Sequence, residues 1–294
     1  MSEILRGMSR DGSARILVIN SRDIVNTAIG YHKTTPTASA ALGRLLTGAS
    51  MVGSLQGEKA NRITFSVSGN GPIGKMLATA DYYGNVKGYI ENPAADVPPK
   101  KNGKLDVGAA VGRGTLAVIR EDGSPEPHIG TVALESGEIA EDITRYFAES
   151  EQIPTLCALG VTVDRDYTCL AAGGVLVQLL PFADEAVISQ LERNAAALYD
   201  ISRYFREGKT LLEVAEIAME GIPFDPFDTI EVEYRCDCSR ERMLAAVTRV
   251  GEADLRTMLD EEERDGHGRT LEVTCHFCDA AYRFGEDELL NRKK

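Results

Sequence analysis

Two close pairs of cysteines near the C-terminus constrain the fold of this chain more than any other feature of its sequence. Cys236 and Cys238 are separated by one residue, and Cys275 and Cys278, after a long spacer, by two. Each pair can reach one metal ion from a single turn, and four thiolates form the tetrahedral soft-ligand site that zinc prefers. The first pair could also close a small-ring disulfide once the metal is gone. The pattern therefore predicts either a structural zinc site or a site that exchanges its zinc for disulfides.

The other cysteines and the neighbouring histidine are weaker candidates for this site. Cys157 and Cys169 stand in apolar, strand-like segments, where a cysteine behaves as a small hydrophobic residue. His276 lies inside the second pair and could replace a thiolate, although four thiolates already complete a site. We therefore predict one zinc ion per chain, held by the two cysteine pairs.

Length, charge and cysteine usage narrow the class of protein. A chain of 294 residues exceeds the usual size of one domain, so two domains, or a large one with a small satellite, are expected. The net charge of −13 argues against nucleic acid as a partner, because phosphate binding depends on clustered Lys and Arg. The sequence has no recognisable signal peptide or membrane-spanning run, and its cysteines do not resemble a secreted disulfide scaffold. We expect a cytoplasmic protein with no nucleic-acid or membrane partner.

Residues 1–180 carry the pattern of a mixed α and β domain. Apolar residues at helical spacing predict helices over 22–33 and 138–149, and another helix that Thr37 or Ser39 would cap. Short apolar runs bounded by Gly, Pro, Asn or Asp predict strands over residues 14–20, 63–68, 86–90, 115–120, 129–134, 156–164 and 169–180.

Residues 181–230 change to a helical pattern. Helices are predicted over 184–204 and 210–220, and the narrow apolar stripe that includes Leu191 and Leu198 is of the kind that usually packs locally. This stretch is the expected linker.

Residues 231–294 predict a small domain built around the cysteines. A helical insert over 239–265, capped by Ser239, separates the two pairs, and strands over 271–274 and 281–284 place the second pair on a hairpin turn. Because the core of such a unit is tiny, the metal would hold its fold together. The chain as a whole is predicted to be α+β, with a mixed N-terminal domain, a helical linker and a small zinc-binding C-terminal domain.

Short motifs typical of other functional classes are present, but they lack the neighbouring residues or elements that those functions require. The sequence G-x-G-x-x-G at 69–74 follows a strand, and 75–80 could open a helix, but the strands beyond do not match a dinucleotide-binding unit. We interpret it as a turn. Gly208-Lys209-Thr210 resembles the end of a phosphate loop whose first glycine is replaced by Arg203. With no G-x-S-x-G motif and no catalytic constellation, the chain is predicted not to be an enzyme.

Three further motifs accompany the cysteine pairs. They are Pro36-Thr37-Ala38-Ser39-Ala40-Ala41-Leu42-Gly43-Arg44, Gly71-Pro72-Ile73-Gly74-Lys75 and Gly88-Tyr89-Ile90-Glu91-Asn92-Pro93. With these motifs and the cysteine pairs, nearly the whole chain resembles the heat-shock protein 33 family of redox-regulated chaperones. The cysteine pairs, in their order and with a helical spacer, are the most specific part of the resemblance.

The resemblance implies a chaperone that is switched by oxidation. Its reduced form would bind zinc and be inactive. Peroxide with unfolding stress, or hypochlorous acid, would form disulfides between Cys236 and Cys238 and between Cys275 and Cys278, release zinc, unfold the C-terminal region and loosen the linker. The exposed surface would then hold unfolding proteins without ATP, often as a dimer, before ATP-dependent refolding chaperones act on them. Residues 184–220 are our candidate for part of that surface.

Two other classes of protein compete with this interpretation. A nucleic-acid-binding zinc ribbon also has two cysteine pairs, but acidic residues outnumber basic ones from Glu231 onward. A thiol-disulfide oxidoreductase would use its C-x-x-C pair at the start of a helix, whereas Cys275 follows a predicted strand. Asp237, between the first two thiols, is where we expect the ease of disulfide closure to be tuned.

Overall fold

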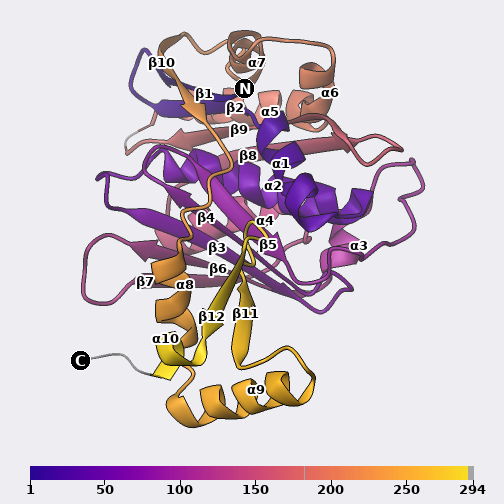
Figure 1. Ribbon diagram of the computed structural model, residues 1–294. Coiled ribbons are helices and arrows are strands. Elements are labelled where there is room, and N and C mark those ends of the chain that lie inside the picture. The colour runs from indigo at the N-terminus through magenta and orange to yellow at the C-terminus, as the bar shows by residue number, and fades with distance from the viewer. Residues whose placement is uncertain (182, 291–294) are drawn as a thin grey trace. The chain divides into compact units, whose positions relative to one another are not determined.

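The computed structural model describes residues 1–181 and 183–290, and the chain forms two compact units, Met1–Arg235 and Cys236–Lys294. Helices and antiparallel strands build both units, which confirms the predicted α+β class (Figure 1). Among the described helices, none has the length and apolar character to cross a membrane.

The first unit contains two five-stranded antiparallel sheets. One has the strand order β10-β1-β2-β9-β8, and the other the order β5-β4-β3-β6-β7. The strands of the first sheet are β1 (Ser2–Ser9), β2 (Ala14–Asn20), β8 (Thr155–Val163), β9 (Cys169–Leu179) and β10 (Phe224–Val232). Those of the second are β3 (Arg62–Gly69), β4 (Lys75–Asp81), β5 (Val86–Ile90), β6 (Gly114–Glu121) and β7 (His128–Ala133).

The helix α2 (Pro36–Gly53) contacts strands of both sheets and is the centre of the main core. Nearly all of its side chains are buried, which its small and aliphatic residues permit. A Cβ atom added at Gly48 would lie 2.5 Å from Ile143 Cδ1, so this glycine allows close packing. The helix α1 (Arg22–His32) packs beside it. Thr35 caps α2 through its side chain, so the prediction of Thr37 or Ser39 as the cap was wrong; both are buried inside the helix.

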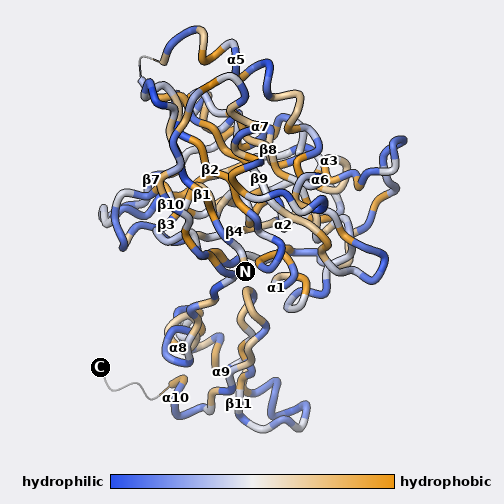
Figure 2. The backbone as a smooth tube through the Cα atoms, turned by 90° about the horizontal axis from the view of Figure 1, so that it is seen from above, coloured by the Kyte–Doolittle hydropathy of each residue, from blue (hydrophilic) through white to orange (hydrophobic). Residues whose placement is uncertain are grey.

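The helical stretch after Pro181 lies on the opposite face of the first sheet. It comprises α5 (Glu185–Ala195), a 3-10 turn (Ala196–Leu198), α6 (Ile201–Arg206) and α7 (Leu211–Ala218). Leu191 and Leu198 of the predicted stripe are buried there against Val175 and Val177, in a second core cluster. The central strands β2 and β9 of this sheet are strongly hydrophobic because side chains on both of their faces are buried in a core (Figure 2).

Several elements differ from the sequence-based expectations. Residues 75–81 form strand β4 rather than the start of a helix, because Met76, Ala78 and Ala80 alternate into the core. Strand β1 and the short helix α3 (Val107–Val111) were not predicted. Strand β10 includes Pro226, which is tolerated because β10 lies at the edge of its sheet and has a bulge at Phe227, next to the proline. The helix α4 (Ala140–Tyr146) continues as a π-helical turn, Phe147–Glu151.

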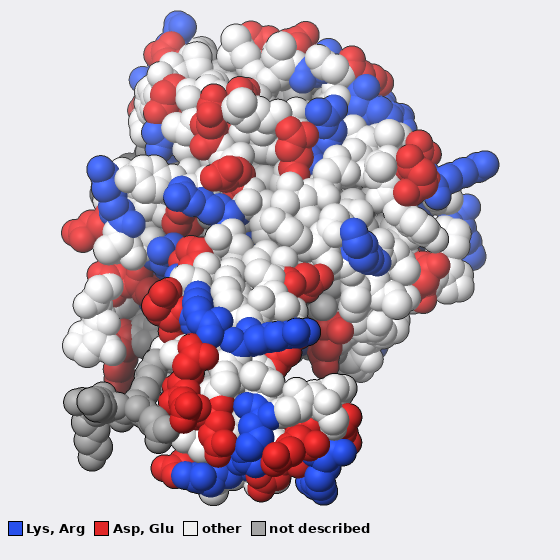
Figure 3. Space-filling view, viewed as in Figure 1, with Lys and Arg blue, Asp and Glu red and all other residues white. Residues whose placement is uncertain are grey.

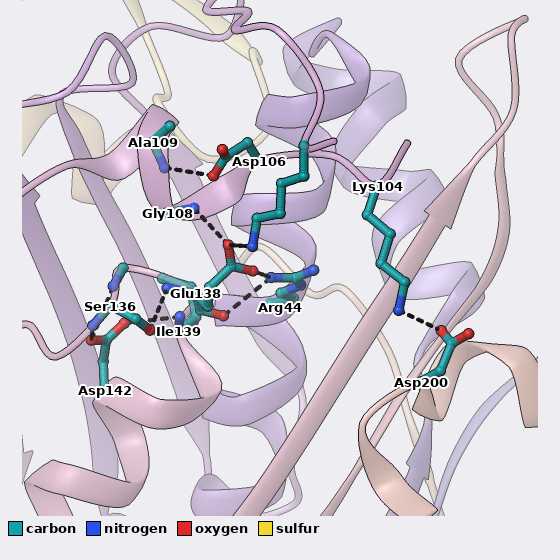
Figure 4. A network of polar contacts seen from close by, with 12 residues as sticks. Arg44, Lys104, Asp106, Gly108, Ala109, Ser136, Glu138, Ile139, Asp142 and Asp200 are labelled. Atoms are coloured by element: carbon teal, nitrogen blue, oxygen red, sulfur yellow. Dashed lines mark hydrogen bonds and ion pairs between the residues drawn. The ribbon is translucent and has the colours of Figure 1, made fainter. Parts of the chain in front are cut away.

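A polar network joins the loops beside α2 (Figure 4). The Glu138 carboxylate accepts hydrogen bonds from Lys100 Nζ at 2.6 Å and from the backbone amide of Gly108 at 3.0 Å, and it pairs with Arg44. Burial would raise the pKa of Glu138, but Arg44 and Lys100 hold it below its usual value. Asp142 accepts hydrogen bonds from four backbone amides of the loop that leads into α4. The carboxylates thus stabilise this loop.

The second unit is a small α+β arrangement. Its elements are α8 (Arg240–Val247), α9 (Glu252–Arg264), the hairpin of β11 (Thr270–Thr274) and β12 (Ala281–Gly285), and α10 (Glu286–Leu290). The predicted hairpin is confirmed, and Ser239 caps α8 as expected. Its core consists of Leu255, Leu259, Leu271, Phe284 and Leu289.

Candidate metal centre

The two cysteine pairs reach the site from different kinds of local structure. Cys236 and Cys238 lie in the extended segment just before α8. Cys275 and Cys278 lie in the turn between β11 and β12, closed by hydrogen bonds from the Asp279 amide to the Cys275 carbonyl and from the Cys275 amide to the Ala280 carbonyl. Hairpin geometry, rather than a helix N-terminus, therefore presents the second pair, which is not the setting of a thioredoxin-like C-x-x-C motif.

The four sulfur atoms converge on one point. All of them lie within 4.8 Å of one another, with 3.7 Å between the sulfurs of Cys236 and Cys275 and 3.4 Å between those of Cys238 and Cys278. Zinc bonded tetrahedrally to sulfur at about 2.3 Å requires sulfurs about 3.8 Å apart, so this donor set fits one such ion. His276 does not belong to the group. The fold thus brings together all four cysteines that the sequence singled out.

Two side chains that the sequence analysis did not name as site residues surround the first pair. The hydroxyl of Tyr282, on β12, lies 3.1 Å from Cys238 Sγ. Arg242, on α8, hydrogen-bonds the Asp237 carbonyl at 3.0 Å and pairs with the Asp237 carboxylate. Only the hairpin register places Tyr282 beside a sulfur 44 residues earlier in the chain. Arg242 could have been found from the sequence. A helix capped by Ser239 has Arg242 in its first turn, close to Asp237.

Without metal the thiols ionise unequally. Burial raises the pKa of Cys236, and it raises the pKa of Cys278 to about 11. Burial opposes ionisation of Cys238 too, but hydrogen bonds from Tyr282 and Cys278 outweigh it and lower the pKa of Cys238. The pKa of Tyr282 is raised to about 12, chiefly by its hydrogen bond to Cys238. Of these three thiols, Cys238 is the one whose surroundings lower its pKa.

Charged contacts hold the rest of the unit around this site. Arg240 donates two hydrogen bonds to the Glu288 carboxylate and lies over the ring of Phe284. Arg269 pairs with three carboxylates, those of Asp260, Glu263 and Glu286. Acidic and basic side chains intermix over the exposed face of this unit (Figure 3). Such exposed pairs contribute little to stability, so a metal ion held by the four sulfurs would be a stronger link between the segments that carry the cysteines.

Other sequence features do not form part of a site. Cys157 and Cys169 are buried, and burial raises the pKa of each thiol to about 12, so both remain protonated and unreactive at neutral pH. This confirms their interpretation as small hydrophobic residues. The G-x-G-x-x-G stretch at 69–74 is the turn between β3 and β4, as interpreted, and no helix follows it.

Comparison with known proteins gives a consistent result over the whole chain. Residues 2–285 match the family model described as Hsp33 protein. The chain belongs to the Hsp33 family. The 33 kDa chaperonin of Clostridioides difficile is 42% identical over 288 residues, with 98% of this chain and 97% of the relative covered. That of Lachnoclostridium phytofermentans is 40% identical over 286 residues, covering 97% and 96%.

A solved structure of an Hsp33 relative agrees with the fold. The crystal structure of the 33 kDa chaperonin, or heat shock protein 33 homolog, from Thermotoga maritima has a TM-score of 0.88 at 36% identity. It covers 98% of this chain, and 96% of that chain is covered in return. Membership of a chaperone family implies a role in binding other proteins rather than in catalysis.

Proposed function

We propose that this Hsp33 chain is a redox-regulated holdase that works without ATP, and that its reduced, zinc-bound form is inactive. The observation that carries the proposal is the convergence of four cysteine sulfurs within 4.8 Å, in a unit where five of the side chains up to residue 290 form the buried apolar core. A structural zinc site contributes on the order of 10 kcal/mol or more to the folding of a small domain. Losing the metal ligands would therefore unfold this unit.

Zinc, when bound, keeps the four sulfurs as thiolates at neutral pH, and the thiolate is the form that oxidants attack. One cysteine thiolate attacks hydrogen peroxide, takes up one oxygen as a sulfenic acid and releases hydroxide. A second thiolate attacks that sulfur, forms the disulfide and releases another hydroxide. Formation of one disulfide thus removes two electrons from the two thiolates, and one peroxide molecule accepts them. Both sulfurs then cease to be metal ligands.

We assign the final disulfides to Cys236 with Cys238 and to Cys275 with Cys278. The folded unit also brings Cys236 near Cys275 and Cys238 near Cys278. These contacts depend on the hairpin and on the segment before α8 staying in place. Once the first sulfur is oxidised and the unit loosens, only the partners that are close in sequence remain within reach.

The proposed active form exposes surface from the middle of the chain. We divide the chain into a domain of residues 1–180, a linker of 181–230 and a redox domain of 231–294, of which 291–294 lie outside the described residues. In the folded protein the apolar side chains of α5–α7 are buried against the first sheet. Loosening this region would uncover both surfaces for unfolding clients, with dimerisation and transfer to ATP-dependent refolding chaperones following in the cytoplasm. The proposed function involves no nucleic acid and no membrane.

The test combines metal release with chaperone activity. Zinc release is followed with a chromophoric chelator while light scattering reports the aggregation of an unfolding client protein. We expect the reduced protein to hold one zinc and not to suppress aggregation, and peroxide at elevated temperature to release zinc and confer suppression. Equal suppression before and after oxidation would overturn the switch.

A further inference from the structure

The four sulfurs of the metal centre have different surroundings. Tyr282 approaches Cys238 with its hydroxyl oxygen 3.1 Å from Sγ. Its ring is held in place because Tyr282 faces Val273 across the hairpin and packs against the small core of the unit. The hydroxyl therefore reaches Cys238 from a fixed ring rather than from a freely rotating side chain.

The direction of this hydrogen bond follows from the ionisation of the sulfur. A thiolate has no proton to give, so the phenol must donate and the sulfur must accept. A hydrogen bond to a charged acceptor is stronger than one between neutral groups, and it draws electron density from the sulfur lone pairs. A thiolate stabilised in this way is a weaker nucleophile towards an oxidant.

The neighbouring backbone is fixed as well. Arg242 holds both the carbonyl and the carboxylate of Asp237, the residue between the first two cysteines. The short C-x-C segment is therefore anchored to α8 on one side, while the Cys238 sulfur is in contact with β12 through Tyr282 on the other.

We propose that Tyr282 is a positioning residue of the switch, whose hydroxyl donates to the Cys238 thiolate and protects that sulfur, so that peroxide attacks another of the four first. This inference rests on the proposed zinc switch. It adds a residue that sets how readily the switch responds, because the rate of the first oxidation depends on the nucleophilicity of each sulfur.

The variant Tyr282→Phe tests the hydroxyl alone, since it keeps the ring and its packing. With the zinc-loaded full-length protein, we expect peroxide to release zinc about threefold to tenfold faster from the variant, the range that loss of one charge-assisted hydrogen bond allows. Tyr83→Phe, at an exposed tyrosine of the first unit, is the matched control and should react like the wild type. Equal rates for Tyr282→Phe and the wild type would overturn the proposal.

A spectroscopic measurement separates this proposal from the switch itself. In the cobalt(II)-substituted protein, removing the donor raises the energy of the sulfur lone pair, so the sulfur-to-cobalt charge-transfer band of Tyr282→Phe should move to longer wavelength. If the band does not shift, the proposed role of Tyr282 is wrong, even where peroxide releases zinc. If the band shifts but peroxide releases no zinc, the proposed switch is wrong and the hydrogen bond is established.

The wild-type protein provides a test that does not depend on how the variant folds. Sulfenic acids formed at limiting peroxide are trapped with dimedone and located by mass spectrometry of peptides. We expect adducts on cysteines of the centre other than Cys238, and a new adduct at Cys238 in Tyr282→Phe. Trapping chiefly at Cys238 in the wild type would contradict the protection.

Discussion

The core around α2 and the unit around the cysteines are stabilised in opposite ways. Nearly every residue of α2 is buried between two sheets, whereas α8 in the second unit buries none of its side chains. The first region depends on many apolar contacts, and the loss of one leaves the others in place. Under the proposed zinc switch, the second depends on four sulfur atoms that act as a group. A fold that must respond to an oxidant benefits from the second kind of stability, because one chemical event can remove it.

Metal removal should give the largest difference in stability between the two regions. Chelation of zinc under reducing conditions should unfold the second unit, at a cost on the order of 10 kcal/mol, and leave the first folded. Hydrogen exchange measures this directly, since amides of β11 and β12 should lose their protection while those of α2 keep it. Retained protection in the hairpin would show that the small apolar core suffices without metal.

A cavity in the main core should have a smaller effect and leave the metal centre intact. Leu45→Ala, at a fully buried position of α2, should lower the free energy of unfolding of the first unit by about 2 to 5 kcal/mol. Leu212→Ala, at an exposed leucine of α7, is the matched control and should change it little. Urea denaturation gives the stability, and zinc content should stay at one per chain. Zinc loss in Leu45→Ala alone would mean that the two regions are coupled.

The polar network beside α2 should make the first unit sensitive to acid. Because the pKa of Glu138 is depressed in the folded state, its charged form stabilises the fold above the usual value of 4.5, and this contribution is lost as the pH falls through the depressed pKa. Glu138→Gln should therefore cost about 1 to 3 kcal/mol at pH 7 and progressively less in acid. Chemical denaturation of both proteins at a series of pH values checks this. If the loss of stability caused by Glu138→Gln does not change with pH, it comes from packing rather than from charge.

The smallest effect is expected at Asp237, where the sequence suggested that disulfide closure is tuned. Its partner Arg242 is largely exposed, so Asp237→Asn should change the stability of the second unit by at most about 1 kcal/mol. Its effect should appear instead in the rate at which Cys236 and Cys238 close a disulfide, measured by timed alkylation. Asp279→Asn, in the turn of the other pair, is a suitable comparison. Equal closure rates in Asp237→Asn and the wild type would remove Asp237 from the switch.

The sequence by itself determined the features that depend on local pattern. Cysteine spacing singled out the four residues whose sulfurs converge, alternating apolar residues located most strands, and the hairpin and the Ser239 cap followed from short-range chemistry. The predictions failed where local signals are weak. The alanine-containing strand β4 could be taken for a helix, and Thr35, beside Thr37 and Ser39, offered a third equivalent cap.

Only the tertiary structure decided which distant segments meet. Strand β10 pairs with β1 more than 200 residues earlier, the helices α5–α7 bury their stripe on the first sheet, and Tyr282 reaches Cys238. Periodicity reports which face of an element is buried, but not which partner covers it. That choice depends on packing and strand pairing summed over the whole chain, and for this reason the four sulfurs could be identified from the sequence while the hydroxyl that makes them unequal could not.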